Sequence, residues 1–483
     1  MKKILIYITI IVAVAQLAAC KKWLDVTSKS EIVENEMFSD EQGFFDAMGG
    51  VYFSLTNDDL YGDKLTMSLL DVLAHRYNIN DWADGIANSV YNVVPGYGKS
   101  WDPINYPAFY NDPKIAAMIK NIWKQSFFVV AGINNVLKNI DGRQQLFTEN
   151  NYNLIKGEAL GLRAFLHFDL LRMYGYSYKS GADSTRMPYV TQFSAKEITP
   201  FYKTRSIVDS IIADLNTAAE LLKDDDIKAS SAINSWKYKR QSHFNNLAVW
   251  GTLARVYLFK GDKANAMLYA EKVINSQKLR LATRSDFIAT AAKIDYSLSV
   301  EHIFSLSHPK VDAKRIEYFD GQYKSTSLGN NRSNLLVVYE SAAGGSTDYR
   351  LLYGWTASSG SYPVKYQQNP AVEPKVVPLI RLAEMYYIAA ECAGTVTEGL
   401  KYLNAVRYNR GIPDLLPMSE ESFSNEIMKE YIKEFYAEGV LFYYYKRLDK
   451  QSVMEHDGTF LAIPNVAQYV FPVPVDEMII GDR

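Results

Sequence analysis

Cysteine and histidine are scarce in this chain, and their scarcity excludes the sites that they build. Only two cysteines occur in 483 residues, Cys20 and Cys392, so neither a disulfide framework nor a zinc site made of cysteines can form. The six histidines include no His-x-x-x-His motif, and none is followed by a glutamate. This argues against a histidine-built metal site on a helix. We therefore expect no metal and no cofactor.

The chain also lacks an excess of either charge. It has 52 Lys and Arg against 54 Asp and Glu, a net charge of −2. Proteins that bind nucleic acids need basic residues to neutralise phosphates, so we expect no nucleic acid partner. With 48% apolar and 22% charged residues, the composition excludes chain-wide disorder, collagen and a multi-span membrane protein.

Aromatic residues are the abundant class. The chain has 35 Tyr, 22 Phe and 7 Trp, and Tyr outnumbers the 27 Gly. Many of these rings fall in two loop-rich tracts, at about 57–114 and 278–376, among Asn, Asp, Gly and Pro. Loops of this length are usually functional or disordered, and their aromatic density argues against disorder.

The N-terminus has the pattern of a secretion signal. Lys2 and Lys3 precede an apolar run over 4–17, which is shorter than the roughly 20 residues of a spanning helix. Leu17-Ala18-Ala19-Cys20 follows and resembles a lipobox, so residues 1–19 are predicted to be a signal peptide. Cys20 is then the predicted site of lipidation, and Cys392, in an apolar helical stretch, is predicted to be a buried thiol.

The rest of the chain favours a mostly α fold. Apolar residues recur at helical spacing, and Lys260-Gly261-Asp262 is a tight turn between two segments that resemble a tetratricopeptide unit. The pair at 377–407 follows the same pattern. We expect an α-solenoid core of tetratricopeptide-like helix pairs, wrapped by long irregular loops and a few short strands. The predicted helical segments are 44–55, 115–140, 154–174, 207–222, 247–259, 264–274, 377–393, 399–407 and 423–448.

Several short motifs follow one another in order along the chain. They are Gly157-Glu158-Ala159 through Arg163-Ala164 to Phe168 and Gly175, Met187-Pro188-Tyr189-Val190, Asp214-Leu215, Leu379 to Tyr386 with Ala390-Glu391, Asn404 with Val406-Arg407, Glu430, Glu434, Glu438-Gly439, and Phe471-Pro472-Val473-Pro474 with Glu477. Taken in this order, they resemble the SusD/RagB family of outer-membrane nutrient-binding lipoproteins from Bacteroidetes. The resemblance covers nearly the whole chain, signal included, with departures at Leu441 and Tyr444, and at Gly481-Asp482 in place of Asn-Pro.

The resemblance implies a binding protein without catalysis. It implies a single SusD-like domain over 20–483, with an N-terminal part to about 230 and a tetratricopeptide-like and C-terminal part over 231–483. It also implies a lipid anchor in the outer membrane facing the cell surface, and delivery of a nutrient, an oligosaccharide, to a SusC-like TonB-dependent transporter. Flat aromatic rings stack on sugar faces, while polar side chains bind the hydroxyl edges. The candidate ligand contacts are Asp71, Arg76, Trp82, Trp101, Tyr106, Tyr323, Tyr353 and Trp355.

Two alternatives to this function stay open. A peptide-capturing member of the same family would use a deeper cleft with exposed backbone groups. An envelope scaffold that binds no small ligand would bury Trp82, Trp101 and Trp355. Catalytic patterns fail on inspection: Gly96-Tyr97-Gly98-Lys99-Ser100 lacks the first glycine of a phosphate loop.

Paired carboxylates give no glycosidase signature either. Glu434 and Glu438 lie one helical turn apart, whereas glycosidase carboxylates flank a bond across a cleft. We expect Glu434 and Glu438, and likewise Arg381, Glu384 and Arg407, to form ion pairs between helices.

Overall fold

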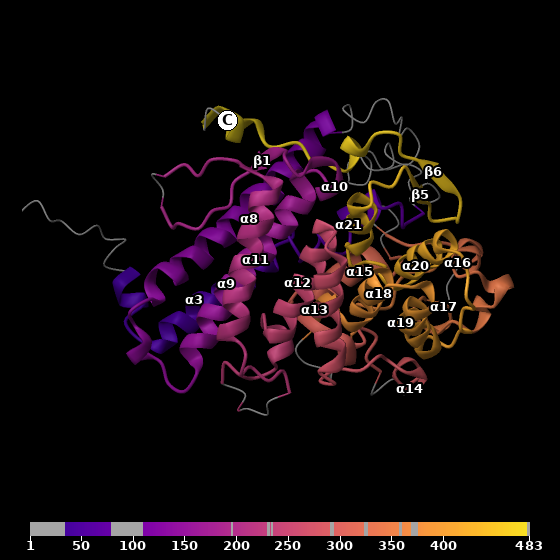
Figure 1. Ribbon diagram of the computed structural model, residues 1–483, viewed down its shortest axis with the longest axis horizontal. Helices are drawn as coiled ribbons and strands as arrows, with labels where there is room; N and C mark the ends of the chain where they lie inside the picture. Colours follow the sequence, from indigo (N-terminus) through magenta and orange to yellow (C-terminus); the bar gives the residue numbers. More distant parts are fainter. Residues whose placement is uncertain are drawn as a thin grey trace, which may run out of the picture.

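Two long helices, α8 (Pro113–Ile140) and α9 (Asn151–Tyr174), organise the N-terminal half of the computed structural model (Figure 1). Helix α8 begins where the sequence places a cap and a proline, because Asp112 accepts hydrogen bonds from the N–H groups of Lys114 and Ile115 at 2.8 and 3.3 Å. The structure describes residues 34–78, 110–194, 197–228, 232, 235–289, 294–322, 327–356, 360–368 and 375–480. None of the helices in these ranges combines the length and apolarity that crossing a membrane requires.

Helix α9 is buried on nearly all sides, and two glycines allow its neighbours to approach. A side chain at Gly157 would place its Cβ 2.6 Å from Leu222, at the end of α11 (Thr204–Leu221). A Cβ at Gly161 would overlap the ring of Phe244. On its other sides α9 packs against α8 and α3 (Glu41–Leu55). The glycines of the family motif therefore act through close packing.

Two helix pairs form the expected tetratricopeptide-like core. Helices α12 (Asn246–Lys260) and α13 (Lys263–Asn275) turn at Gly261, whose φ of +83° suits glycine. Helices α18 (Leu382–Cys392) and α19 (Val396–Asn409) form the second pair, and α13 packs directly on α18. Cys392 is buried, as predicted. Helices make up 58% of the structure and strands 7%, which confirms the mostly α class.

One predicted helix begins as a strand. Residues Val376–Arg381 form β4, which pairs antiparallel with β3 (His302–Ser307), with Ser305 opposite Pro378. Every residue of β4 is buried. A continuous apolar run buried on both faces cannot be distinguished by periodicity from a buried helix, so the predicted helix over 377–393 was wrong in its first third.

The last predicted helix is in fact two. Helix α20 (Glu420–Glu434) ends at a five-residue turn, and α21 (Val440–Arg447) starts after it. Ala437 and Gly439 have φ of 59° and 67° there. A Cβ at Gly439 would collide with the carbonyl oxygen of Leu65, so close approach of another segment requires glycine at this turn.

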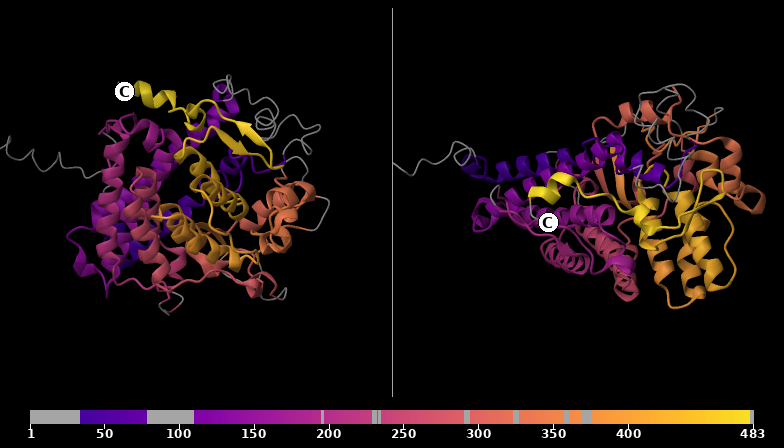
Figure 2. Two further views of the ribbon diagram at one scale, coloured as in Figure 1. Left: turned by 45° about the vertical axis from the view of Figure 1, so that its right-hand side comes forward. Right: turned by 90° about the horizontal axis from the view of Figure 1, so that it is seen from above.

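The two loop-rich tracts contain more regular structure than predicted, and the chain ends in a β5–β6 hairpin and a short helix. Figures 1 and 2 show the N-terminal helices, indigo to magenta, on one side and the helices from α16 to α20, orange to gold, on the other, while the last helix, yellow, lies beside the N-terminal helices. Elements in and around the tracts are α4 (Leu69–Leu73), α14 (Arg284–Phe287), α15 (Val311–Phe319), α16 (Arg332–Val338) and α17 (Tyr349–Tyr353). The remaining short elements are α10 (Tyr178–Gly181), β1 (Thr185–Met187), β2 (Tyr202–Lys203), β5 (Ser452–Met454), β6 (Phe460–Ala462) and α22 (Val475–Ile480).

Candidate functional site

Two candidate residues of the second tract, Tyr353 and Trp355, line one small cavity. Helix α17 is capped by Asp348, which accepts a hydrogen bond from the N–H of Arg350 at 2.9 Å. This short helix places Tyr353 at the cavity wall, where its ring is half-buried. Trp355 follows and is held by an isolated bridge to Pro363. Two of the eight candidate contacts thus come together at one site.

Trp355 forms part of the cavity wall with little of its surface exposed. Its indole N–H donates to the hydroxyl of Tyr339 at 3.3 Å, and its ring packs edge-on against Tyr436 with centroids 4.4 Å apart. Only 6% of Trp355 is exposed. Its flat face is therefore occupied by protein, and Trp355 supports the wall that Tyr353 presents.

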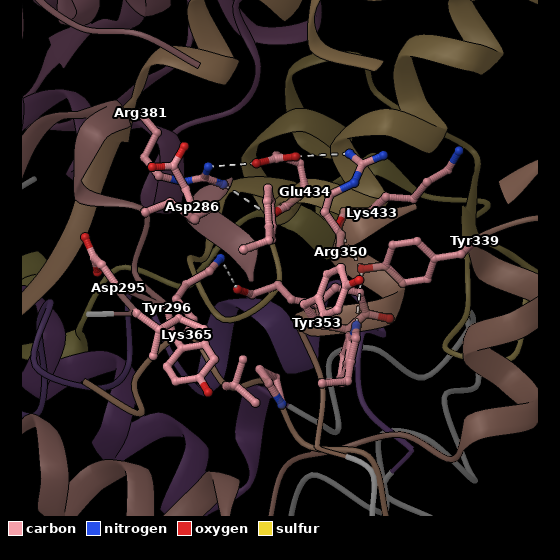
Figure 3. Close-up of a pocket in the computed structure, with 18 residues that line it drawn as sticks. Asp286, Asp295, Tyr296, Tyr339, Arg350, Tyr353, Lys365, Arg381, Lys433 and Glu434 are labelled. Carbon is pink, nitrogen blue, oxygen red and sulfur yellow. Dashed lines mark hydrogen bonds and ion pairs between the residues drawn. The ribbon is translucent and has the colours of Figure 1, made fainter. Parts of the chain in front are cut away.

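The cavity combines apolar walls with a charged floor (Figure 3). Its volume is about 60 Å³, which leaves room for a few water molecules. A sugar ring or a peptide does not fit inside, so the cavity can hold only an edge or a substituent of a larger ligand. The lining residues include Phe287, Ile294, Leu298, Pro363 and Val364 on the walls and Lys365, Arg381 and Glu434 at the floor.

The floor of the cavity is a buried ion-pair network centred on Glu434. Glu434 accepts hydrogen bonds from Arg381 at 2.7 Å, Arg410 at 2.8 Å and Arg350 at 3.0 Å, and Figure 3 shows it between Arg381 and Arg350. Burial alone would raise the pKa of Glu434, but Arg410 and Arg381 hold that pKa well below its usual range. Glu438 pairs with Arg381 at 2.8 Å. Both glutamates thus form ion pairs, as predicted, but Arg381 is the last residue of β4 and Glu438 lies in the turn after α20, so these pairs do not join two helices.

The other predicted ion pairs are also confirmed. Arg407 donates to Glu430 at 2.6 Å, and Glu384 pairs with Arg255 at 2.5 Å. All four side chains are buried. A buried charge network of this kind constrains the relative orientation of the helices. Because arginines already bind these carboxylates, they are not free to exchange protons with a substrate, as acid–base catalysis requires.

Asp71 and Arg76, the first-tract candidates in the described ranges, lie in the core. Asp71 is fully buried, and its carboxylate accepts hydrogen bonds from the N–H groups of Ala437 and Gly439, the latter at 3.1 Å. Burial raises the pKa of Asp71 to about 7, although the guanidinium of Arg76 and the N–H of Ala437 favour the charged form. The structure therefore gives the carboxylate of Asp71 a role in holding a turn, where we had expected a ligand contact.

Arg76 is linked to Trp355, a residue of the second tract, through the ring of Tyr436. Its guanidinium lies 4.2 Å from the centre of the Tyr436 ring and donates to the carbonyl of Ile432 at 3.2 Å. Within the described residues, the Nε and Nη1 atoms of Arg76 have no hydrogen-bond acceptor. Because Trp355 packs on the same tyrosine, candidates 279 positions apart are joined by one ring that sequence reasoning missed.

Four more candidates, Trp82, Trp101, Tyr106 and Tyr323, lie outside the described residues, as does Cys20. Sequence reasoning also missed Tyr296, Tyr339 and Lys365 at the cavity. The aromatic richness of the second tract was the available signal for the tyrosines. In the described ranges, no group of His, Cys, Asp and Glu side chains gathers in a way that could hold a metal ion.

Comparison with protein families gives two matches that follow one another along the chain. A family model described as starch-binding and associating with the outer membrane matches residues 22–258. The model of the SusD family matches residues 264–470. A curated relative, SusD-like protein P2 from Formosa agariphila, is 26% identical over 289 residues, which are 58% of this chain and 48% of the relative. The match thus spans about half the length of that relative.

Solved structures share the fold over nearly the whole chain. A SusD-like carbohydrate binding protein from Bacteroides vulgatus has a TM-score of 0.69 at 19% identity, covering 92% of this chain and 97% of its own. A putative sugar binding protein from the same species has a TM-score of 0.67 at 20% identity, with the same coverage. A SusD superfamily protein from Bacteroides thetaiotaomicron has a TM-score of 0.64 at 20% identity, covering 92% and 98%.

Proposed function

The chain belongs to the SusD family of binding proteins associated with the outer membrane, and on this premise we propose that it captures an oligosaccharide and passes it to a SusC-like TonB-dependent transporter. Members of this family bind their ligands without transforming them. The observation that carries the proposal is that Arg76 of the first tract and Trp355 of the second both pack on Tyr436, which lines the same cavity as Tyr353.

The chemistry of this cluster suits one edge of a sugar. A pyranose has an apolar C–H face and a polar hydroxyl edge, and sites for it mix aromatic walls with few polar groups. Tyr353 offers a half-buried ring at the cavity, and the cavity floor carries charged groups. In this proposal Trp82, Trp101, Tyr106 and Tyr323 supply the stacking surface on which the rest of the oligosaccharide lies.

Support for a sugar rather than another nutrient comes from the related proteins. One matching family model is described as starch-binding, and two of the similar structures belong to proteins described as carbohydrate or sugar binding. One observation supports the scaffold alternative. That alternative expects Trp355 to be buried, and Trp355 is buried.

Titration calorimetry tests the nutrient class. The chain from Lys21 onward is titrated with plant, host and microbial oligosaccharides and with mixed peptides. Saturable binding of one glycan class, measured as heat, supports the proposal. Heat from peptides alone that Tyr353→Ala abolishes transfers the function to the peptide-capturing alternative, and the absence of heat from both ligand classes supports the scaffold.

The anchor and the partner need separate tests. We propose that Cys20 carries acyl chains, since several chains anchor a protein stably where one is marginal. Cys20→Ala should move the protein from the membrane fraction to the soluble fraction, whereas Cys392→Ala should leave it in place. A tagged chain purified from native membranes should bring down a TonB-dependent receptor, and repeated failure to do so contradicts the delivery step.

A further inference from the structure

A second and much larger hollow lies at one end of the helix pairs. It is a groove with a volume of about 670 Å³, a size typical of binding sites. Its walls are the turn between α12 and α13, the turn between α18 and α19, the start of α20 and the end of α21, with α10 at one side. No residue is shared between this groove and the cavity at Tyr353.

The groove carries a positive rim on a net-negative chain. Four cationic side chains line it, against the two carboxylates of Glu391 and Glu420. Glu391 is engaged by Arg447 in two hydrogen bonds of 2.7 Å. Lys179 and Lys263 are exposed and form no ion pair within the described part of the chain. Two uncompensated lysines at the rim favour an occupant that bears carboxylates.

The rest of the lining disfavours a glycan. Sugar sites read hydroxyl edges with side chains such as Asp and Asn, and neither type is among the described residues that line this groove. The rings of Phe259, Phe423 and Tyr444 are each less than 8% exposed, so they offer no free face for stacking. Tyr178, the fourth aromatic residue of the lining, is half-buried and packs edge-on with Phe259. Val396 and Leu448 are half-buried at the floor and can contact aliphatic side chains.

The turn between α18 and α19 offers backbone groups to the groove. Ala393 has φ −58° and ψ 145°, and Thr395 has φ −138° and ψ 155°, so the chain is extended here. Gly394 and Thr395 are exposed, and within the described structure their N–H groups donate no hydrogen bond. Free backbone donors next to an apolar floor suit a polypeptide, which can pair through its own backbone.

We propose that this groove binds an extended polypeptide segment of a partner protein, one that carries carboxylate side chains beside aliphatic ones. The carboxylates pair with Lys179 and Lys263, because Lys260 already pairs with Asp209 at 3.0 Å, while the aliphatic side chains contact Val396 and Leu448. This role is independent of the oligosaccharide proposal, because the two sites share no residue. Either proposal can therefore fail without the other.

A defined peptide tests the groove directly. The probe is an acetylated, fluorescein-labelled octapeptide that alternates Glu with Leu, and binding to the chain from Lys21 onward is followed by fluorescence anisotropy. The same peptide with Lys in place of Glu is the charge control. We expect saturable binding of the acidic peptide that weakens as salt is raised, and no binding of the basic one.

Matched variants locate the binding. The double variant Lys179→Glu, Lys263→Glu should lower the affinity for the acidic peptide by at least about tenfold. Val396→Asp should lower this affinity by a similar factor. A carboxylate at the first position of α19 suits a helix N-terminus, so Val396→Asp should fold normally, as circular dichroism can verify. Lys223→Glu, at an exposed lysine outside the groove, should change nothing. The proposal is overturned if the acidic peptide does not bind, or if it binds the groove variants as well as the wild type.

Discussion

The carboxylate of Asp71 accepts a hydrogen bond from the backbone N–H of Gly439 at 3.1 Å, although the two residues lie 368 positions apart. The same carboxylate accepts from the N–H of Ala437. It thereby holds the turn between α20 and α21, which carries Tyr436 to the aromatic cluster. A residue expected to bind ligand instead positions another residue that lines the site.

Replacing Asp71 should therefore destabilise the fold. Asp71→Ala leaves the buried N–H groups of Ala437 and Gly439 without an acceptor, and each such group costs about 1–3 kcal/mol. Urea denaturation should show a loss of that order or more. Asp46→Ala, on the exposed face of α3, is the control and should change stability by less than about 0.5 kcal/mol. Equal stability of the two variants would contradict the role of Asp71.

Asp71 should also make stability depend on pH. Burial raises its pKa in the folded protein to about 7 from the ordinary aspartate value of 3.8. Between these values the folded state keeps a proton that the unfolded state has lost, so the contribution of Asp71 is present near pH 4 and is lost as the pH rises towards 7. The slope is at most about 1.4 kcal/mol per pH unit. Asp71→Asn has no such proton, and the difference in unfolding free energy between wild type and variant should fall across this window. A constant difference would refute the raised pKa.

The network beneath the cavity should be sensitive to loss of one member. Glu434→Gln removes the charge that three buried arginines share, and breaking a buried pair in this way costs about 3–5 kcal/mol. Asp476→Asn breaks the pair with Lys120, whose side chains are 59% and 51% exposed, and should cost less than about 1 kcal/mol. Urea denaturation at pH 7 measures both. A loss for Glu434→Gln no greater than that for Asp476→Asn would show that the network contributes little.

Two glycine-to-alanine substitutions should change the stability of the protein in opposite directions. In Gly161→Ala the new methyl group would overlap the Phe244 ring, and such overpacking costs about 1–3 kcal/mol. In Gly49→Ala the methyl group meets nothing within 4 Å, so the helix should gain roughly 0.5–1 kcal/mol. Thermal unfolding by circular dichroism gives the sign of each. A stabilised Gly161→Ala would mean that α9 and Phe244 can separate without cost.

Local sequence predicts the elements whose causes are local. Helix α8 starts at a proline that follows a capping aspartate, and the turn at Gly261 needs a left-handed residue, so both could be found from residue order. Strand β4 could not, because its uniform burial removes the alternation that identifies strands. The break after Glu434 was missed because its stabilising partner, Asp71, lies at the other end of the chain.

The residues of the candidate site likewise divide into those that the sequence predicts and those that only the structure reveals. Ion pairs for Glu434 and Arg381 were predicted from their charges, but the sequence placed both on helices, whereas Arg381 ends strand β4. Tyr436 was missed because the local pattern places it inside a helix, and only its contacts with Arg76 and Trp355 reveal its place. The stacking residues proposed at Trp82, Trp101, Tyr106 and Tyr323 remain predictions.

The most direct test of oligosaccharide capture is a calorimetric titration of the wild type, Tyr353→Ala and Tyr408→Ala with the glycan panel. Tyr408 is 76% exposed on α19, outside the cavity, and serves as the matched control. We predict saturable heat from one glycan class, weakened roughly tenfold, or about 1.4 kcal/mol, in Tyr353→Ala and unchanged in Tyr408→Ala. Heat from no glycan, or equal affinity in all three proteins, would contradict the proposed capture at this site.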